Sequence, residues 1–178
     1  EEVDFIVMGA TGQGGLADKF FGSISSSVGR KAHCPVLLVP NGVVYNPIEK
    51  ILFSSNFESV EDDMIHELFD FAAPFHASVH FVHVSEGDDG EDKDLQREIF
   101  EEVFEQKSTI PSFETSVIYH SSISDGINQY ALDHEVDIIA AVTHKRSFWE
   151  SLLHKSTTKE LALTTTLPLL VLHWRDDD

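Results

Sequence analysis

The stretch FIVMGATG at residues 5–12, followed after nine residues by GS at 22–23, decides how this sequence is interpreted. An apolar run ends at the first glycine, and a serine-rich segment follows the last. This order predicts a strand, a glycine-rich loop and a helix start. Glycine permits positive φ and close approach of the backbone to a ligand, and the free N–H groups at a helix start face anions. The spacing matches neither the Walker A nor the Rossmann pattern, yet it predicts a loop that can hold phosphate.

An internal repeat is the second informative feature of the sequence. A shift of 133 residues aligns Asp4–Pro40 with Asp137–His173 without a gap, so that PVLLV at 35–39 falls on PLLVL at 168–172. Only the second copy is preceded by a long further stretch, residues 48–136. We therefore predict the C-terminal part of a first domain at residues 1–42, a linker at 43–47 and a complete second domain at 48–178.

The two copies differ most in the glycine-rich loop. In the second copy, side chains replace the glycines at which backbone could approach a phosphate, and this predicts a degenerate site there. The replacements are Gly9 by Val142, Gly12 by Lys145, Gly15 by Phe148, Leu16 by Trp149 and Gly22 by Lys155.

The complete domain is predicted to have the order βαβαβαβαβ. Short apolar strands separated by helices predict an open parallel five-stranded sheet with helices on both faces. In such sheets, ligands bind beyond the carboxyl ends of the strands. The candidate loops are therefore those at Asn56, at Thr143–Ser156 and, in the first copy, at Gly9–Ser23. The predicted strands are 48–54, 79–84, 115–119, 137–142 and 169–172, and the predicted helices are 60–73, 95–104, 124–132 and 150–163. Ser124 or Asp125 is the predicted N-cap of the third helix.

Composition restricts the partners. The 178 residues carry a formal net charge of -19, from 31 acidic and 12 basic side chains. Nucleic acid and acidic membrane surfaces are disfavoured as partners, because binding to them requires lysine and arginine. No apolar run reaches the length of a membrane helix, and the one cysteine, Cys34, fits a reducing cytoplasm. We therefore expect a cytoplasmic protein.

Catalytic and metal-binding patterns are weak. His80 and His83 should point to opposite faces of a strand, and no Cys-x2-Cys or His-Glu-x-x-His spacing is present. The serine run Ser23–Ser27 lacks a Gly-x-Ser-x-Gly elbow, and Glu101 is expected on a solvated helix face. We predict no catalytic residue and no metal ligand, and therefore a protein that is not an enzyme.

The glycine spacing, the run DFIVMG at 4–9 and CPVLLVP at 34–40 resemble the universal stress protein family. Residues 48–173 resemble a second domain of that family, so the resemblance covers nearly the whole chain in a tandem arrangement. It implies the adenine nucleotide alpha hydrolase-like fold and binding of ATP, alone or with Mg²⁺. In the second copy Asn56 stands near the family's nucleotide-contacting aspartate. The nucleotide-binding residues implied by the resemblance are Met8, Gly9, Gly12, Gly22, Ser23 and Ile24.

The resemblance implies a stress-response protein that acts by binding an adenine nucleotide rather than by catalysis. A nucleotide-free scaffold or dimerisation module is the alternative. A slow ATPase would need an acid to position water, and Asp18 is the only acid in the loop. The resemblance also implies that strands Val36–Val39 and Leu169–Leu172 meet at their edges, in a homodimer or a pseudo-dimer. The first-copy fragment must dock on the complete domain, on another chain or on further residues, since so short a fragment cannot form a core alone.

Overall fold

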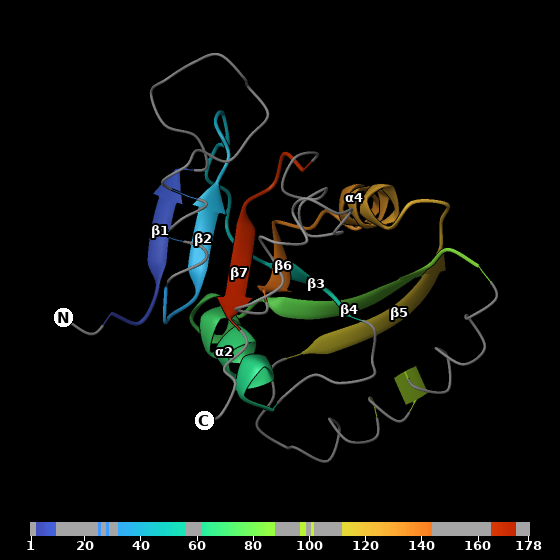
Figure 1. Ribbon diagram of the computed structural model, residues 1–178, viewed down its shortest axis with the longest axis horizontal. Coiled ribbons are helices and arrows are strands. Elements are labelled where there is room, and N and C mark those ends of the chain that lie inside the picture. Colours follow the sequence, from blue (N-terminus) through green and yellow to red (C-terminus); the bar gives the residue numbers. More distant parts are fainter. Residues whose placement is uncertain are drawn as a thin grey trace. The chain divides into compact units, whose positions relative to one another are not determined.

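The computed structural model describes residues 3–9, 25, 28, 32–55, 62–87, 97, 98, 101, 112–143 and 165–173 (Figure 1). They form a mixed α/β structure with seven strands and with helices between them. Contacts divide the chain into two units, one made of Glu1–Asn46 with Ala140–Asp178 and the other of Pro47–Ile139. Each unit is described by itself below.

The unit Pro47–Ile139 is built on three parallel strands, β3 (Lys50–Ser54), β4 (Ser78–Ser85) and β5 (Phe113–Tyr119). β4 lies between the other two, with β3 pairing it from Lys50↔Ser78 and β5 from Val79↔Phe113. The predicted parallel arrangement of these strands is confirmed. β5 begins two residues earlier than predicted because Phe113 and Glu114 still pair with β4.

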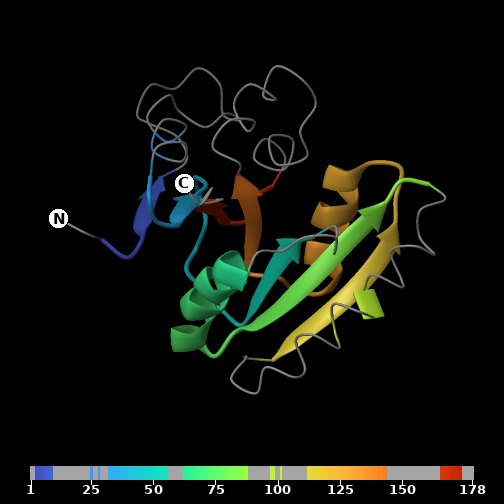
Figure 2. The same cartoon turned by 60° about the horizontal axis from the view of Figure 1, so that its bottom comes forward.

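Helices α2 (Asp62–Ala72) and α4 (Ile123–Asp133) lie on opposite faces of β4 (Figure 2). Successive side chains of a strand point to opposite faces. The ring of Phe81 packs edge-to-face against Phe69 of α2, with centroids 6.1 Å apart. The neighbouring His80 contacts Tyr130 of α4 instead. Helices on both faces, as predicted, leave β3 and β4 almost entirely buried.

The helix ends follow local chemistry. α2 ends at Ala72, and Pro74 lies in the short 3-10 helix η1 (Ala73–Phe75) that continues it. The predicted N-cap of α4, Ser124 or Asp125, is wrong. Ser122 has the extended backbone of a cap, and its Oγ accepts a hydrogen bond from the Asp125 N–H.

The core of this unit lies where the two helices meet the strands. Its completely buried side chains remove apolar surface from water and provide the main stabilisation. The largest are Ile51, Leu52, Leu68, Phe81, Ile127, Ile138 and Ile139.

The other unit contains β1 (Ile6–Gly9), β2 (Val36–Val39) and β7 (Leu169–His173). β1 and β2 are parallel, from Ile6↔Val36 to Gly9↔Val39, whereas β2 and β7 are antiparallel. The predicted meeting of the two last strands is therefore confirmed. β6 (Ile138–Thr143) follows β7 in the strand order, and it passes from one unit to the other at Ala140.

The β2–β7 pairing has the symmetry of the sequence repeat. Leu37 lies opposite Leu170, and these two residues correspond under the 133-residue shift. Val36 pairs with Val171, which is the counterpart of Leu38 in the repeat. Leu38 pairs with Leu169, which is the counterpart of Val36. The pairing is therefore self-complementary about Leu37 and Leu170, as in an isologous interface.

Part of the predicted structure lies outside the described residues. In the predicted helix 95–104, Arg97, Glu98 and Glu101 have helical backbone. Its other residues, the predicted helix 150–163 and Asn56 lie outside the described ranges.

Candidate functional site

The predicted nucleotide site begins at the carboxyl end of β1. Met8 and Gly9 are the last residues of this strand, where Met8 is partly buried and Gly9 is exposed. The apolar run thus ends at the first glycine, as predicted, at the carboxyl end of β1. Gly12, Gly22, Ser23 and Ile24 lie outside the described residues. Their nucleotide-binding role therefore stays a prediction.

The corresponding end of β6 has different side chains. β6 continues to Thr143, and Val142, which replaces Gly9 in the repeat, is half-buried. A valine side chain at this point occupies space that Gly9 leaves open. Lys145, Phe148, Trp149 and Lys155 lie outside the described residues, so the degenerate character of this loop also stays a prediction.

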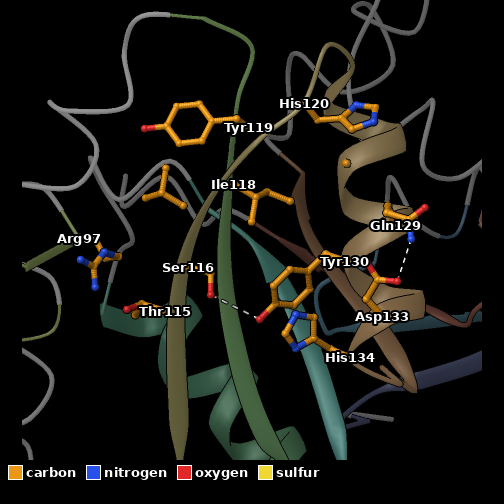
Figure 3. A pocket seen from close by; sticks show the side chains of 12 residues that line it. Arg97, Thr115, Ser116, Ile118, Tyr119, His120, Gln129, Tyr130, Asp133 and His134 are labelled. Carbon is orange, nitrogen blue, oxygen red and sulfur yellow. Dashed lines mark hydrogen bonds between the residues drawn. The ribbon is translucent and has the colours of Figure 1, made fainter.

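A second feature, not predicted from the sequence, is a groove of about 550 Å³ in the unit Pro47–Ile139 (Figure 3). It is lined by β5, by α4 and by the Arg97 side chain. Figure 3 shows Tyr130 of α4 directed across the groove toward Ser116 of β5. Their oxygens are 3.5 Å apart.

Tyr130 joins the groove to a buried histidine. Its Oη lies 3.1 Å from Nδ1 of His80, and Nε2 of that ring lies 3.3 Å from Ser78 Oγ. A neutral imidazole with its proton on Nε2 satisfies both contacts, because Nε2–H donates to Ser78 while Nδ1 accepts from Tyr130. The rings of Tyr130 and His134 stack with centroids 3.9 Å apart.

Burial favours the neutral forms of both buried rings. Burial lowers the pKa of His80, more than the nearby Glu114 carboxylate raises it. Burial likewise raises the pKa of Tyr130, and the hydrogen bond to Ser116 lowers it by less. At neutral pH, then, a neutral histidine accepts from a protonated tyrosine, and this pair holds α4 against β4.

Other polar groups of the groove pair with one another. Arg97 Nη1 lies 2.8 Å from Glu101 Oε1, which also accepts from Thr115 Oγ1. Gln129 Nε2 donates to Asp133 Oδ1 at 2.8 Å. Glu101 is thus half-buried and bonded to β5, contrary to the solvated position expected for it. Arg97 with Glu101 and Gln129 with Asp133 have the i,i+4 spacing of a helix, which the sequence shows, whereas no spacing indicates the bond between Thr115 and Glu101.

The histidines of β4 have separate partners. His83 Nδ1 lies 3.1 Å from the carbonyl oxygen of Ser55, at the end of β3, whereas His80 faces α4. The predicted opposite orientation of these two rings is confirmed. Within the described ranges, no three His, Cys, Asp or Glu side chains gather as metal ligands. None of the helices described is long and apolar enough to cross a membrane.

Comparison with solved structures shows the fold. A universal stress protein from Archaeoglobus fulgidus DSM 4304 matches 98% of this chain with a TM-score of 0.72 and 20% identity, and the chain covers 62% of that protein. A universal stress protein in complex with cAMP matches 72% of the chain, which covers 98% of it, with a TM-score of 0.57 and 11% identity. A third structure, of the universal stress protein from Archaeoglobus fulgidus in complex with dAMP, matches 71% of this chain. The chain covers 98% of that protein, with a TM-score of 0.52 and 12% identity.

The chain thus spans about three fifths of the first of these relatives. Among curated proteins, none matches it. The profile of the Universal stress protein family, however, matches residues 1–40 and 47–173. This match covers nearly the whole chain, so the chain belongs to the universal stress protein family.

Proposed function

We propose that this universal stress protein binds an adenine nucleotide, with ATP as the first candidate, at the loop that leaves β1. Gly9 carries the structural part of the proposal, because it is exposed at the carboxyl edge of a parallel strand pair. Two structural neighbours are described as complexes with cAMP and dAMP. The residues proposed to contact the nucleotide are Met8, Gly9, Gly12, Gly22, Ser23 and Ile24.

The two copies are proposed to differ in binding. The loop after β1 would hold the phosphates on its backbone N–H groups, whereas the loop after β6 would be closed to them. Val142, half-buried where the first copy has an exposed glycine, supports this difference. Mg²⁺, if it accompanies the nucleotide, would neutralise phosphate charge near a strongly acidic protein.

We further propose that the protein acts in a cytoplasmic stress response by binding and not by catalysis. The loop offers a single acid, Asp18, and catalysis of ATP hydrolysis needs a group that positions water. Tyr130 of the groove and the buried His80 beside it are engaged with each other where α4 packs on β4. Neither feature supplies an activated nucleophile.

The strand pairing supports a role in assembly as the second candidate. β2 and β7 meet in a self-complementary register, which is what two associated domains of one family would form. We propose that residues 1–42 are the C-terminal part of one domain, that 43–47 are a linker and that 48–178 are a second domain. In this alternative the pairing serves as a scaffold, without nucleotide.

The site is tested by copying the second loop into the first. Gly12→Lys introduces the residue found at position 145, and we expect it to abolish ATP binding measured by isothermal titration calorimetry. Gly87→Lys is the matched control, since it adds the same charge at an exposed loop where a side chain would meet nothing within 4 Å. Its ATP affinity should equal that of the unchanged protein.

Unchanged affinity in Gly12→Lys would refute the assignment of the loop. Mass spectrometry of the small molecules released on denaturing the purified protein separates the two candidate functions. A released adenine nucleotide supports the binding function. An empty protein that also shows no ATP binding heat supports the scaffold. Titrations with Mg²⁺ and with EDTA determine whether the metal belongs to the ligand.

A further inference from the structure

The groove beside α4 follows the edge of β5 and not one face of the sheet. Successive side chains of a strand point to opposite faces, yet every residue from Thr115 to His120 lines this groove. Figure 3 shows Ser116 and Ile118 on the α4 side of the strand, and Thr115 and Tyr119 on the other side. A space that both sets of side chains reach lies at the edge between the two faces.

The backbone of β5 presents hydrogen-bonding groups at this edge. Within the residues that the structure describes, β5 ends the strand order and pairs with β4 alone. The His120 N–H donates to the Ser85 carbonyl oxygen at 3.0 Å. Because the backbone groups of a strand alternate between its two sides, the N–H and C=O groups of Thr115, Val117 and Tyr119 point away from β4. An edge of this kind is a template for pairing with an extended peptide.

The charge of the chain indicates which kind of strand would pair there. Residues 47–139, the unit that contains the groove, carry 22 acidic and 4 basic side chains, whereas the rest of the chain carries 9 and 8. Nearly all of the net charge of -19 therefore belongs to this unit. A second copy at the same edge would bring two such units together against their mutual repulsion. A cationic segment would be attracted instead.

Two carboxylates lie on the α4 side of this edge. Glu114 Oε2 is 3.8 Å from Nδ1 of His80, which faces α4, and the Glu114 side chain is 65% exposed. Asp133 lines the groove from α4 and is exposed. The other side of β5 carries the half-buried Val117 and Tyr119, whose ring is 64% exposed. A strand added at this edge would therefore place alternate residues beside carboxylates and the residues between them beside apolar surface.

We propose that the outer edge of β5 binds an extended cationic segment of a partner protein as an added β-strand. The backbone groups of Thr115, Val117 and Tyr119 bond the backbone of this segment. Lysine or arginine side chains at its alternate positions reach Glu114 and Asp133. The apolar side chains between them contact Val117 and Tyr119. This interaction does not depend on nucleotide binding at the loop after β1.

The test combines the whole chain with synthetic peptides of about seven residues, which is the length of an ordinary strand. The lysine–valine peptide alternates these two residues. In the glutamate–valine peptide the charge is reversed. In the lysine–proline peptide the charge is kept, but proline removes backbone N–H groups that a strand needs. We expect only the lysine–valine peptide to pair with β5.

Amide hydrogen exchange followed by NMR locates the pairing. The amides of Thr115, Val117 and Tyr119 should exchange freely in the chain alone, and about tenfold or more slowly with the lysine–valine peptide. The amides of Val44 and Tyr45, whose side chains are 79% and 78% exposed in the linker, should exchange at the same rate in both samples.

Two double variants with the same net charge separate the local carboxylates from the overall charge. Glu114→Gln with Asp133→Asn should weaken binding of the lysine–valine peptide about fivefold, which corresponds to the loss of two exposed ion pairs. Glu49→Gln with Asp70→Asn changes exposed residues before β3 and on α2. This control should weaken binding by less than about twofold, since charges beyond a Debye length are screened.

Several results would overturn the proposal. Slow exchange of the Thr115, Val117 and Tyr119 amides in the chain alone would show that the edge is already covered. Equal protection by the lysine–proline peptide would reduce the effect to general attraction between charges, and equal protection by the glutamate–valine peptide would remove the preference for cations. Dimerisation of the chain with protection of these amides would assign the edge to a second copy. No protection by any peptide would refute the pairing itself.

Discussion

Gly126 allows α4 to lie close to β4, and replacing it with alanine tests how close this contact is. A Cβ at position 126 would stand 2.8 Å from Val84 Cγ1 and 3.0 Å from His120 Cβ. Both distances are shorter than ordinary van der Waals contact. Val84 is 4% exposed, and its branched side chain has few alternative rotamers. His120 is held by its own N–H, which donates to the Ser85 carbonyl oxygen at 3.0 Å.

Two opposing effects determine how much Gly126→Ala changes the free energy of unfolding. Alanine in a helix is favoured over glycine by about 1 kcal/mol, whereas overpacking a core costs about 1–3 kcal/mol. We therefore expect Gly126→Ala to lower the free energy of unfolding by about 1 kcal/mol. In a Val84→Ala background the nearest overlap is gone and only the one with His120 Cβ remains, so the same substitution should lower the free energy of unfolding by less than it does in the unchanged protein.

Urea unfolding followed by far-ultraviolet circular dichroism measures both values, provided that the m-values stay equal. Gln129→Ala, at an exposed position of the same helix, is the control and should change the free energy of unfolding by less than about 0.5 kcal/mol. If Gly126→Ala stabilises the protein equally in both backgrounds, α4 does not contact β4 as closely as described.

Two further predictions concern pH and salt. Because burial lowers the pKa of His80 below the unfolded value of 6.5, stability should be full above that pH and fall as the pH drops through it, since the unfolded state binds the proton first. His80→Gln should have a flatter pH dependence of Tm, and an identical profile would contradict this reasoning. The net charge of -19 should make the Tm rise between 0.1 and 1 M KCl, because the Debye length shrinks from about 10 to about 3 Å. A Tm that stays constant over this range would show that charge repulsion contributes little to stability.

Strands were more predictable from this sequence than the contacts between them. The apolar runs that became β3, β4, β6 and β7 are short and bounded by polar or turn residues, so local pattern alone located them. The cap of α4 was misplaced because Ser122, Ser124 and Asp125 can all cap a helix, and only the backbone conformation distinguishes Ser122. The meeting of β2 and β7 came from family resemblance and not from periodicity.

The groove was beyond sequence reasoning. His80 and Tyr130 are 50 positions apart, and Glu101 and Thr115 are 14 apart. None of these pairs follows a helical or strand spacing. Only the register of β4 with β5 and the position of α4 bring them together. Of the predicted nucleotide site, the described residues include only Met8 and Gly9.

The register about Leu37 and Leu170 has a consequence for how the two sides of this contact can change. In a symmetric homodimer, one codon specifies the residue on both sides of the contact, so each substitution occurs twice. A residue that lies opposite its own copy must therefore pack against an identical side chain. Here the two leucines are encoded separately, although they face each other as symmetry mates would. A substitution on one side can therefore be compensated on the other. The same independence lets one loop keep its glycines at residues 9 and 12 while the corresponding positions 142 and 145 carry valine and lysine.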